Sequence, residues 1–374
     1  MKPIQFPNYS NSIMNVTISI LKQYGIQSIY PSIAVLDKEL EKNYKNIVYI
    51  LIDALGDSIL KRHSDVAQSL IKDQISTITS VFPPTTVAAT TSVLTGLQPI
   101  ETGWLGWCQY VKEENKNVIF FTNKDYYDDK TVFNYNVSEK NVPVQKIYEL
   151  IEQANLDVST REIFPAFRDA NHDSFLKQCK TIIETCQEKG KHFIYTYWDK
   201  LDTYMHEFGP GSVEAHKMLD SINKGYEYLK DKIDEDTMII LIADHGQIDV
   251  LPIEFRKYTD LWNTFVHEPS VESRATAFFI KENKKDEFER LFNNYFREYF
   301  VLYKTEEVIK MNLFGVGKEH PKFREFLGDY FAIATDNYYF KMDKSNFRMK
   351  GQHSGLLSEE MIVPLIMFSK KKEA

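Results

Sequence analysis

The chain of 374 residues carries 45 Lys and Arg residues against 53 Asp and Glu residues, which gives a formal net charge of −8 at pH 7. This acidic balance argues against a dedicated binder of nucleic-acid polymers, because such proteins normally show a basic excess or stripe. A chain of this length with a hydrophobic fraction of 43% can bury a substantial core, so global disorder is excluded.

Targeting and redox features predict a cytoplasmic protein. The longest apolar runs, at 47–52 and 238–243, are far too short to span a bilayer. Residues 1–15 contain no continuous apolar h-region, so no secretory signal peptide is predicted. The three cysteines are too few and too irregularly spaced for a disulfide framework or a thiolate zinc site.

In chain order, short runs rich in Val, Ile, Tyr and Phe alternate with longer segments of helical periodicity. The predicted strands are residues 46–53, 117–122, 192–198, 238–244, 274–281, 330–335 and 362–368. The predicted helices are residues 57–73, 144–154, 173–188, 213–232 and 284–297. Several strands are continuous apolar runs, which is the pattern of a parallel sheet covered on both faces. We therefore predict an α/β fold of three layers, with a mostly parallel central sheet between helices.

The chain is predicted to form a single domain over residues 1–374, because no internal repeat and no Pro/Gly/Ser-rich linker divides it. The polar stretch at 109–140 and the stretch from about 250 to 350 look like additions to the core. The second addition carries strand and helix signals of its own, so we expect it to form a smaller inserted α+β cap subdomain.

Acidic residues follow directly after two of the apolar strands. Asp53 ends the run NIVYILID, and Asp244 and His245 end the run MIILIADH. Ligands of an open parallel sheet bind outside the carboxyl ends of its strands, so these side chains are expected to share one crevice. Asp53 alone is better explained as a helix cap. The Asp244–His245 pair is harder to explain by packing, since charged residues are rarely buried without a partner.

A helix rich in small residues is predicted to begin near Thr85 and Thr86, in the segment FPPTTVAATTSVLTG. The two prolines before them cannot continue a helix but can precede one. A threonine at this helix start would lie where free backbone N–H groups and the helix dipole favour an anion. The simpler interpretation is an ordinary threonine cap on a buried helix.

Two further segments place histidines near turns. Asp202 and His206 are four residues apart, a spacing that puts both side chains on one helical face, and Asp199 lies three residues before Asp202. His353 lies in the Gly-flanked loop KGQHSG. Taken one by one, these features are also typical of a solvated acidic loop and of a surface histidine.

Together, the three carboxylates, three histidines and one hydroxyl predict a metal site. Carboxylate and imidazole ligands without thiolate suit zinc, and also manganese. This number of ligands fills two metal ions better than one, and paired metal ions recur in phosphoryl-transfer enzymes.

These residues, in this order, resemble the alkaline phosphatase superfamily, and within it the type I phosphodiesterase/nucleotide pyrophosphatase branch. The resemblance extends from Asp53 to His353. It rests on a strand that ends in Asp, a Thr nine residues before a T-G-L segment, a D-x-x-x-H-x-x-G-P pattern, a paired D-H-G and a final G-x-H loop. The resemblance implies an alkaline phosphatase-like fold and a hydrolase of phosphoric esters.

Residue by residue, the resemblance implies that Thr86 is the catalytic nucleophile and forms a phospho-threonine intermediate. It also implies two Zn²⁺ ions per chain, with Mn²⁺ as the alternative. One ion would be held by Asp202, His206 and His353, and the other by Asp53, Asp244, His245 and the Thr86 oxygen. Asp199 falls on no ligand position of the family.

The sequence departs from the family pattern at one place. Family phosphodiesterases carry an Asn, shortly after the nucleophile, that hydrogen-bonds a phosphate oxygen, and Trp107 aligns with it. Indole offers one N–H donor and a large apolar face, so Trp107 and Trp104 are predicted to form a stacking wall for a base or another planar group of the substrate. Simple hydrophobic packing is the alternative interpretation of both residues.

Three functions are compatible with the sequence. The first is a two-metal phosphodiesterase or nucleotide pyrophosphatase that acts on a small-molecule phosphoester. The second is another chemistry on the same scaffold, such as a phosphomonoesterase, a sulfatase-like hydrolase or a phosphomutase. Monoester dianions need extra positive charge, which Arg274, Arg348 or Lys350 would supply unless they are ordinary surface charges. The third is a non-catalytic metal-binding module.

Overall fold

A six-stranded sheet forms the centre of the computed structural model, which describes residues 2–154 and 157–370. In spatial order its strands are β2 (Gln74–Thr79), β17 (Ile362–Ser369), β8 (Thr237–Ile242), β1 (Asn46–Ile52), β7 (Lys191–Trp198) and β6 (Val158–Ile163). β1 pairs in parallel with β7 and β8, and β6 pairs in parallel with β7. β17 runs antiparallel to both β8 and β2, so the sheet is mixed and all strands except β17 point the same way.

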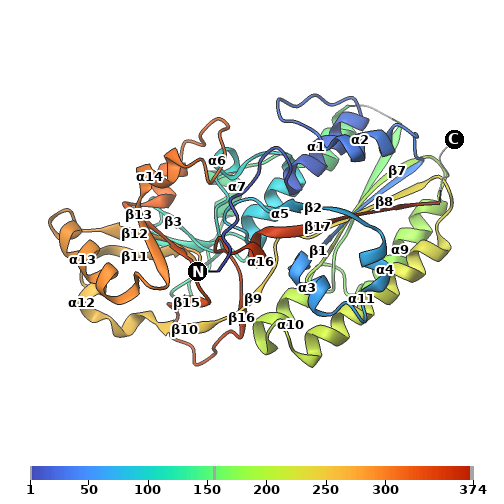
Figure 1. Ribbon diagram of the computed structural model, residues 1–374. Helices are drawn as coiled ribbons and strands as arrows, with labels where there is room; N and C mark the ends of the chain where they lie inside the picture. The colour runs from blue at the N-terminus through green and yellow to red at the C-terminus, as the bar shows by residue number, and fades with distance from the viewer. Residues whose placement is uncertain (1, 155–156, 371–374) are drawn as a thin grey trace.

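Helices cover both faces of this sheet and produce the three predicted layers (Figure 1). On one face lie α1 (Ile13–Gln23), α2 (Ala34–Leu40) and α5 (Thr86–Thr95), and on the other lie α4 (Gln68–Lys72), α9 (Phe175–Gln187) and α11 (Val213–Lys232). β1 and β8 are buried along their whole length, as expected for strands with both faces covered. The α/β fold predicted from the sequence is therefore confirmed.

A second sheet of four antiparallel strands lies beside the first (Figure 1). Its strands are β11 (Phe265–Val271), β12 (Ala275–Ile280), β14 (Tyr330–Ala334) and β13 (Phe300–Lys304) in spatial order. The helix α13 (Lys285–Phe296) contributes Phe288, Phe292 and Phe296 to the aromatic core beneath this sheet. These elements fall in the stretch from about 250 to 350, whose role as an inserted cap stays a prediction.

Smaller elements complete the chain. The helices are α3 (Asp57–Arg62), α6 (Pro99–Thr102), α7 (Val137–Asn141), α8 (Ile147–Gln153), α10 (Lys200–Phe208), α12 (Thr259–Trp262), α14 (Thr305–Lys310), α15 (Phe323–Leu327) and α16 (Ser358–Met361). The strands are β3 (Gln109–Val111), β4 (Lys116–Ile119), β5 (Lys124–Asp125), β9 (Ile248–Asp249), β10 (Leu251–Glu254), β15 (Tyr338–Lys341) and β16 (Gly351–Gln352). None of the helices in the described part of the chain is both long and apolar enough to cross a bilayer.

Some predicted elements differ from the observed ones for local reasons. The helix predicted at 57–73 is two short helices, α3 and α4, separated by a polar segment in which Ser64 and Asp65 favour a turn. The strand predicted at 117–122 is the shorter β4, which pairs with β3 and β5 outside the central sheet. Residues 109–140 therefore form a small sheet of their own and not only a polar loop.

Candidate active site

Distant segments of the chain meet at the carboxyl edge of the central sheet. Asp53 follows β1, and α10 begins directly after β7 and carries Asp202 and His206. Asp244 and His245 follow β8, whereas His353 follows β16, which pairs with β9 just beyond them. Thr86 is the first residue of α5, with Thr85 as its N-cap. The structure thus brings together every ligand residue predicted from the sequence.

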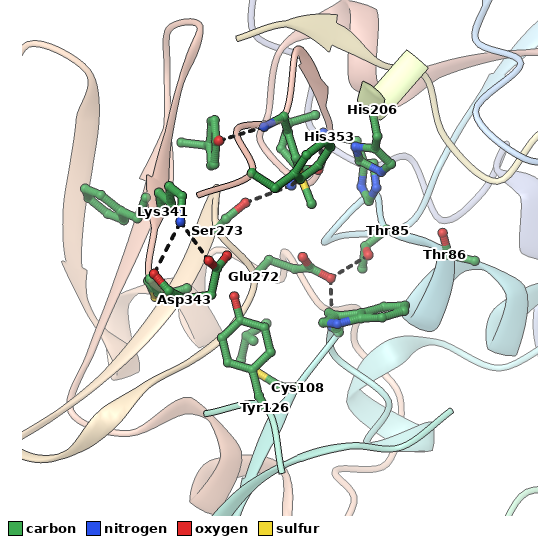
Figure 2. A pocket seen from close by; sticks show the side chains of 18 of the residues that line it. Thr85, Thr86, Cys108, Tyr126, His206, Glu272, Ser273, Lys341, Asp343 and His353 are labelled. Carbon is green, nitrogen blue, oxygen red and sulfur yellow. Dashed lines mark hydrogen bonds and ion pairs between the residues drawn. The ribbon is translucent and has the colours of Figure 1, made fainter. Parts of the chain in front are cut away.

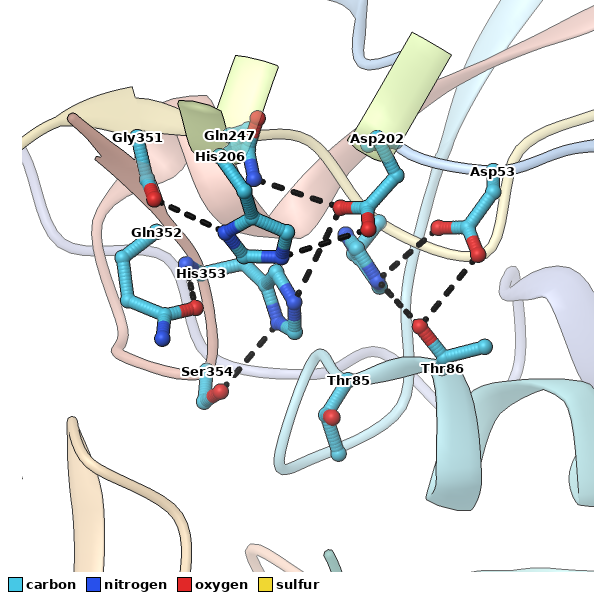
Figure 3. A network of polar contacts seen from close by, with 12 residues as sticks. Asp53, Thr85, Thr86, Asp202, His206, Gln247, Gly351, Gln352, His353 and Ser354 are labelled. Atoms are coloured by element: carbon cyan, nitrogen blue, oxygen red, sulfur yellow. Dashed lines mark hydrogen bonds and ion pairs between the residues drawn. The ribbon is translucent and has the colours of Figure 1, made fainter. Parts of the chain in front are cut away.

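The first group of candidate ligands consists of Asp53, Asp244 and His245, whose ligand atoms all lie within 4.8 Å of one another. Nε2 of His245 lies 3.4 Å from Oδ1 of Asp53 and 3.7 Å from Oδ2 of Asp244. The hydroxyl of Thr86 lies beside this group, 3.4 Å from Oδ2 of Asp53 and 3.3 Å from Nε2 of His245 (Figure 3). The Thr86 oxygen therefore faces both a carboxylate and an imidazole of the first group.

The second group consists of Asp202, His206 and His353. Nε2 of His206 lies 3.2 Å from Oδ2 of Asp202, and Nε2 of His353 lies 3.9 Å from Oδ1 of the same carboxylate (Figure 3). The ring of His353 also stacks on the ring of His245 with a centroid distance of 3.8 Å. The two groups are therefore neighbours within one site.

Backbone carbonyls orient all three histidines. A carbonyl oxygen can only accept a hydrogen bond, so an imidazole nitrogen beside one must carry the proton, and the other nitrogen is left as a lone-pair ligand. In each case the nitrogen beside the carbonyl is Nδ1, so Nε2 is free to bind a metal. The pairs are His206 with Gly351 at 2.8 Å, His245 with Gly246 at 3.0 Å, and His353 with Pro84 at 3.1 Å.

Within the first group, two buried carboxylate oxygens lack a hydrogen-bond partner among the described residues, namely Oδ1 of Asp53 and Oδ2 of Asp244. The other oxygens are occupied: Oδ2 of Asp53 accepts from the Tyr197 hydroxyl, and Oδ1 of Asp244 accepts from the backbone N–H of Ala54 at 3.0 Å. A buried anion without a partner is costly, so these free oxygens call for a cation. The residues present therefore fit a metal site of carboxylate and imidazole ligands.

The electrostatics of the site support the same conclusion. Burial raises the pKa of Asp53 well above its usual range, and the neighbouring Asp244 raises it further. Burial also raises the pKa of Asp244 to about 7. Burial opposes the charged form of His206, but the adjacent Asp202 carboxylate raises the pKa of His206 to about 9. Burial lowers the pKa of His353. Bound cations would stabilise the ionised carboxylates and displace the imidazole protons.

Two glycines permit the close backbone packing of this site. A Cβ on Gly246 would lie 2.0 Å from the carbonyl oxygen of Glu359, which explains why glycine follows the Asp–His pair. A Cβ on Gly351 would lie 2.5 Å from the carbonyl oxygen of Met205. The second contact brings β16 against α10, so that the Gly351 carbonyl reaches His206.

A cavity of about 340 Å³ opens beside Thr86 (Figure 2). Trp107 contributes to its lining and is 40% exposed, and its ring meets the ring of Phe121 edge-on at a centroid distance of 6.4 Å. The second sheet and the segment after it supply the opposite wall, including Glu272 and Lys341. The cavity is therefore built between the two sheets.

Trp104 lies against a different cavity, of about 450 Å³, together with Thr90 and Thr91 of α5. Its indole N–H donates to the carbonyl of Val142 at 2.8 Å. The ring of Phe121 contacts the rings of both tryptophans. Of the two, Trp107 alone lines the cavity beside Thr86.

The basic residues considered for monoester binding lie elsewhere. Arg274 is not the surface charge that the sequence suggested, because it is fully buried and its guanidinium donates to both oxygens of Glu360, at 2.8 and 2.7 Å. Arg348 pairs with Glu254 at 2.7 Å, and Lys350 is exposed. Within the described chain, none of these three lines the cavity beside Thr86.

Three side chains of the site were missed by sequence reasoning. The hydroxyl of Tyr197 donates to Asp53, and the amide of Gln247 donates to Oδ1 of Asp202 at 3.2 Å. Glu272 accepts a hydrogen bond from the Thr85 hydroxyl at 2.6 Å. A polar ring near the end of an apolar strand was an available signal for Tyr197, whereas nothing local in the sequence marks the other two.

Two groups of candidate carboxylate and imidazole ligands lie at the carboxyl edge of a mixed sheet, next to a threonine at the start of a helix. This arrangement is typical of metal-dependent hydrolases of phosphoric esters. Comparison with known proteins agrees: residues 47–356 match the model of the type I phosphodiesterase / nucleotide pyrophosphatase family. The match covers well over half of the chain. The protein is therefore a member of this family and a hydrolase of phosphoric ester bonds.

Solved structures share the fold at low sequence identity. Murine ectonucleotide pyrophosphatase / phosphodiesterase 5 is 20% identical, with a TM-score of 0.65 over 85% of this chain and 87% of that chain. An inactive variant of the murine protein, solved in complex with AMP, is 19% identical, with a TM-score of 0.63 over the same shares. Phosphonoacetate hydrolase from Sinorhizobium meliloti 1021, in complex with phosphonoformate, is 13% identical, with a TM-score of 0.63 over 89% of this chain and 92% of that chain.

Proposed function

We propose that the protein is a two-metal phosphodiesterase or nucleotide pyrophosphatase that works through a phospho-threonine intermediate on Thr86. The observation that carries this proposal is the position of Thr86 at the start of α5, with its hydroxyl facing both Asp53 and His245. Free backbone N–H groups and the positive end of the helix dipole favour negative charge at this position. A phosphoryl group bound here would meet the threonine oxygen directly.

The candidate ligands divide into two metal sites. One ion would be held by Asp53, Asp244, His245 and the Thr86 oxygen, and the other by Asp202, His206 and His353. Zinc is the first choice and manganese the alternative, because the donors are carboxylates and imidazoles. When bound, such ions neutralise charge on the phosphoryl group and lower the pKa of the hydroxyl and water oxygens that they contact.

The chain's own chemistry is a double displacement. The Thr86 oxygen, as the alkoxide, attacks phosphorus in line with the leaving group, so that a bond to Thr86 forms and the bond to the leaving-group oxygen breaks. Water then attacks the phospho-threonine from the vacated side and releases the Thr86 oxygen. Two in-line displacements retain the configuration at phosphorus.

The substrate is proposed to be a small phosphodiester or nucleotide that carries a planar group. Trp107 is half exposed in the cavity beside Thr86, so its indole face is available for stacking. Trp104 would influence this group only through Phe121, which packs between the two indoles.

The test compares three variants with the wild type on bis-p-nitrophenyl phosphate, after loading with zinc or manganese. Thr86→Ala should lower kcat by at least about a thousandfold while two ions per chain are retained. Asp53→Ala should lower both the rate and the metal content. Thr85→Ala is the matched control, because it removes the neighbouring hydroxyl, and it should cost less than about tenfold.

Mass spectrometry of acid-quenched reactions should also find a phosphoryl group on the peptide that contains Thr86. Wild-type-like turnover of Thr86→Ala would remove Thr86 as the nucleophile. A wild-type protein that retains fewer than two ions per chain in excess metal would overturn the two-metal site.

A further inference from the structure

Glu272 places a carboxylate in the substrate cavity, next to the nucleophile. It follows β11, lines the cavity together with Thr85 and Thr86, and is only 6% exposed (Figure 2). Its Oε1 accepts hydrogen bonds from the Thr85 hydroxyl at 2.6 Å and from the backbone N–H of Trp107 at 2.7 Å. Its Oε2 makes no hydrogen bond to the described residues. One oxygen is therefore held in place, and the other is open to the cavity.

The remaining charges of the cavity lining do not compensate this carboxylate. Apart from the candidate metal ligands, the only other charged residues that line it in the described chain are Lys341 and Asp343. The ammonium of Lys341 is already engaged, by Oδ1 of Asp343 at 2.7 Å and by the carbonyl of Ser345 at 2.5 Å. In residues 2–154 and 157–370 no arginine lines the cavity. Glu272 thus adds to the cavity lining a carboxylate that no described arginine or lysine of that lining pairs with.

We propose that Glu272 is a specificity-determining residue that disfavours dianionic phosphomonoesters relative to monoanionic phosphodiesters. This inference rests on the proposed function. The phosphoryl group of a monoester carries close to two negative charges above pH 7, whereas that of a diester carries one. The extra charge of the monoester would lie beside Glu272, in a cavity that is poorer in water than the protein surface. In such a cavity, one additional like charge should change the affinity for the phosphoryl group by about tenfold or more.

The hydrogen bond from the backbone N–H of Trp107 gives Glu272 a second role in substrate selection. That N–H lies on the cavity side of Trp107's chain segment beside Thr85 and donates to Oε1 of Glu272 at 2.7 Å, the same oxygen that accepts from the Thr85 hydroxyl. This N–H is therefore already hydrogen-bonded to a protein carboxylate and is not free for a third phosphoryl oxygen. A monoester is therefore disfavoured in two ways: its second negative charge is repelled by Glu272, and its third phosphoryl oxygen finds no donor in the Trp107 N–H.

The experiment compares kcat/KM for p-nitrophenyl phosphate and bis-p-nitrophenyl phosphate at pH 8 with the metal-loaded protein. Glu272→Gln keeps the size of the side chain and an oxygen acceptor but removes the charge. We expect it to raise the ratio of monoester to diester kcat/KM by about tenfold or more. Glu272→Asp keeps the charge and should hold this ratio within about threefold of wild type. A purely structural role would instead make the two variants alike.

Glu268→Gln is the matched control. Glu268 lies on β11, four residues before Glu272, and it is exposed and outside the cavity lining. Its neutralisation changes the net charge of the protein by the same amount, and it should leave the ratio unchanged. An equal rise in this control would assign the effect to overall charge and overturn the inference.

A binding measurement separates this inference from the proposed function. In Thr86→Ala protein, titration calorimetry gives the affinities for phenylphosphonate, a dianion, and for methyl phenylphosphonate, a monoanion. Adding Glu272→Gln should strengthen the binding of phenylphosphonate by about tenfold relative to that of its methyl ester. If the wild type hydrolyses neither ester, the proposed function fails while this comparison still decides the role of Glu272. An unchanged affinity ratio would overturn the role of Glu272 even where the diester is hydrolysed.

Discussion

Tyr197 shows how a single hydroxyl can orient a candidate metal ligand. It lies on β7 beside the end of β1, and its hydroxyl donates to Oδ2 of Asp53. This contact fixes the carboxylate so that Oδ1 remains without a hydrogen-bond partner and faces Nε2 of His245 at 3.4 Å. Partners of this kind hold ligating carboxylates in place, and their loss commonly weakens metal binding by about 10- to 100-fold.

The corresponding prediction concerns Tyr197→Phe, which removes the hydroxyl and keeps the ring. We expect the affinity of the first metal site to fall by about 10- to 100-fold, because Asp53 loses its orienting donor. Competition with a chelating dye measures this affinity. Tyr195→Phe, two residues earlier on the same strand, is the control, since no hydrogen bond or ion pair joins Tyr195 to a candidate ligand in the described structure. Equal affinities for the two variants would contradict this role of Tyr197.

At this scale, the sequence identified the residues that stand at a strand end or on one helical turn. Asp53, Asp244 and His245 could be found because each follows a continuous apolar strand, and Asp202 and His206 because they are four residues apart. Glu272 could not be found, because its partner Thr85 is 187 positions away and no pattern links the two. Whether the gathered residues hold metal ions stays a prediction.

The packing of β16 against α10 is the element-scale feature that completes the second group. Gly351 allows this contact, because any Cβ there would lie 2.5 Å from the carbonyl of Met205 on α10. The same approach lets the Gly351 carbonyl accept from Nδ1 of His206 at 2.8 Å and brings His353 beside Asp202. A displacement of β16 would therefore disturb two candidate ligands, His206 and His353, together.

We predict that Gly351→Ala weakens the second metal site by at least about tenfold and leaves the first site less affected. The reason is that backbone atoms, unlike the end of a flexible side chain, cannot move aside. Stepwise metal titration followed by calorimetry resolves the two sites. Gly211→Ala, in the turn after α10, is the matched control, because its Cβ would meet only the flexible end of Arg62 at 3.2 Å. Two unchanged binding steps in Gly351→Ala would refute the argument.

How well each strand could be predicted from the sequence depended on how deeply the strand is buried. The strands β1, β7 and β8 are covered on both faces and were recognisable as apolar runs. The strands β2 and β6 lie at the two edges of the sheet and carry exposed Ser, Thr and charged residues, so no such run marks them. An apolar run also does not reveal direction, which is why the antiparallel course of β17 could not be predicted.

At the scale of the whole molecule, both sheets contribute residues to the site. The carboxyl edge of the central sheet supplies the candidate ligands and Thr86, whereas the second sheet and the segment after it supply Glu272, Lys341 and the far wall of the cavity. Substitutions in the second sheet should therefore alter substrate preference more than metal content. This division agrees with the general pattern in which chemistry is held by a rigid sheet edge and specificity by additions to it.

The folding of the whole chain buries several carboxylates close together, so metal ions should contribute to its stability. Without a cation, burial and mutual repulsion raise the pKa of Asp53 well above its usual range. An ion that binds only the folded chain adds about 4 kcal/mol when its concentration is about a thousand times its Kd. We therefore expect zinc or manganese to raise the Tm by at least about 5 °C over chelator-treated protein, as measured by scanning calorimetry. Asp53→Ala should lose about half of this increment, because it impairs one of the two sites. A metal-loaded protein that melts at the same temperature as the chelated one would show that the gathered carboxylates and imidazoles bind no ion of consequence.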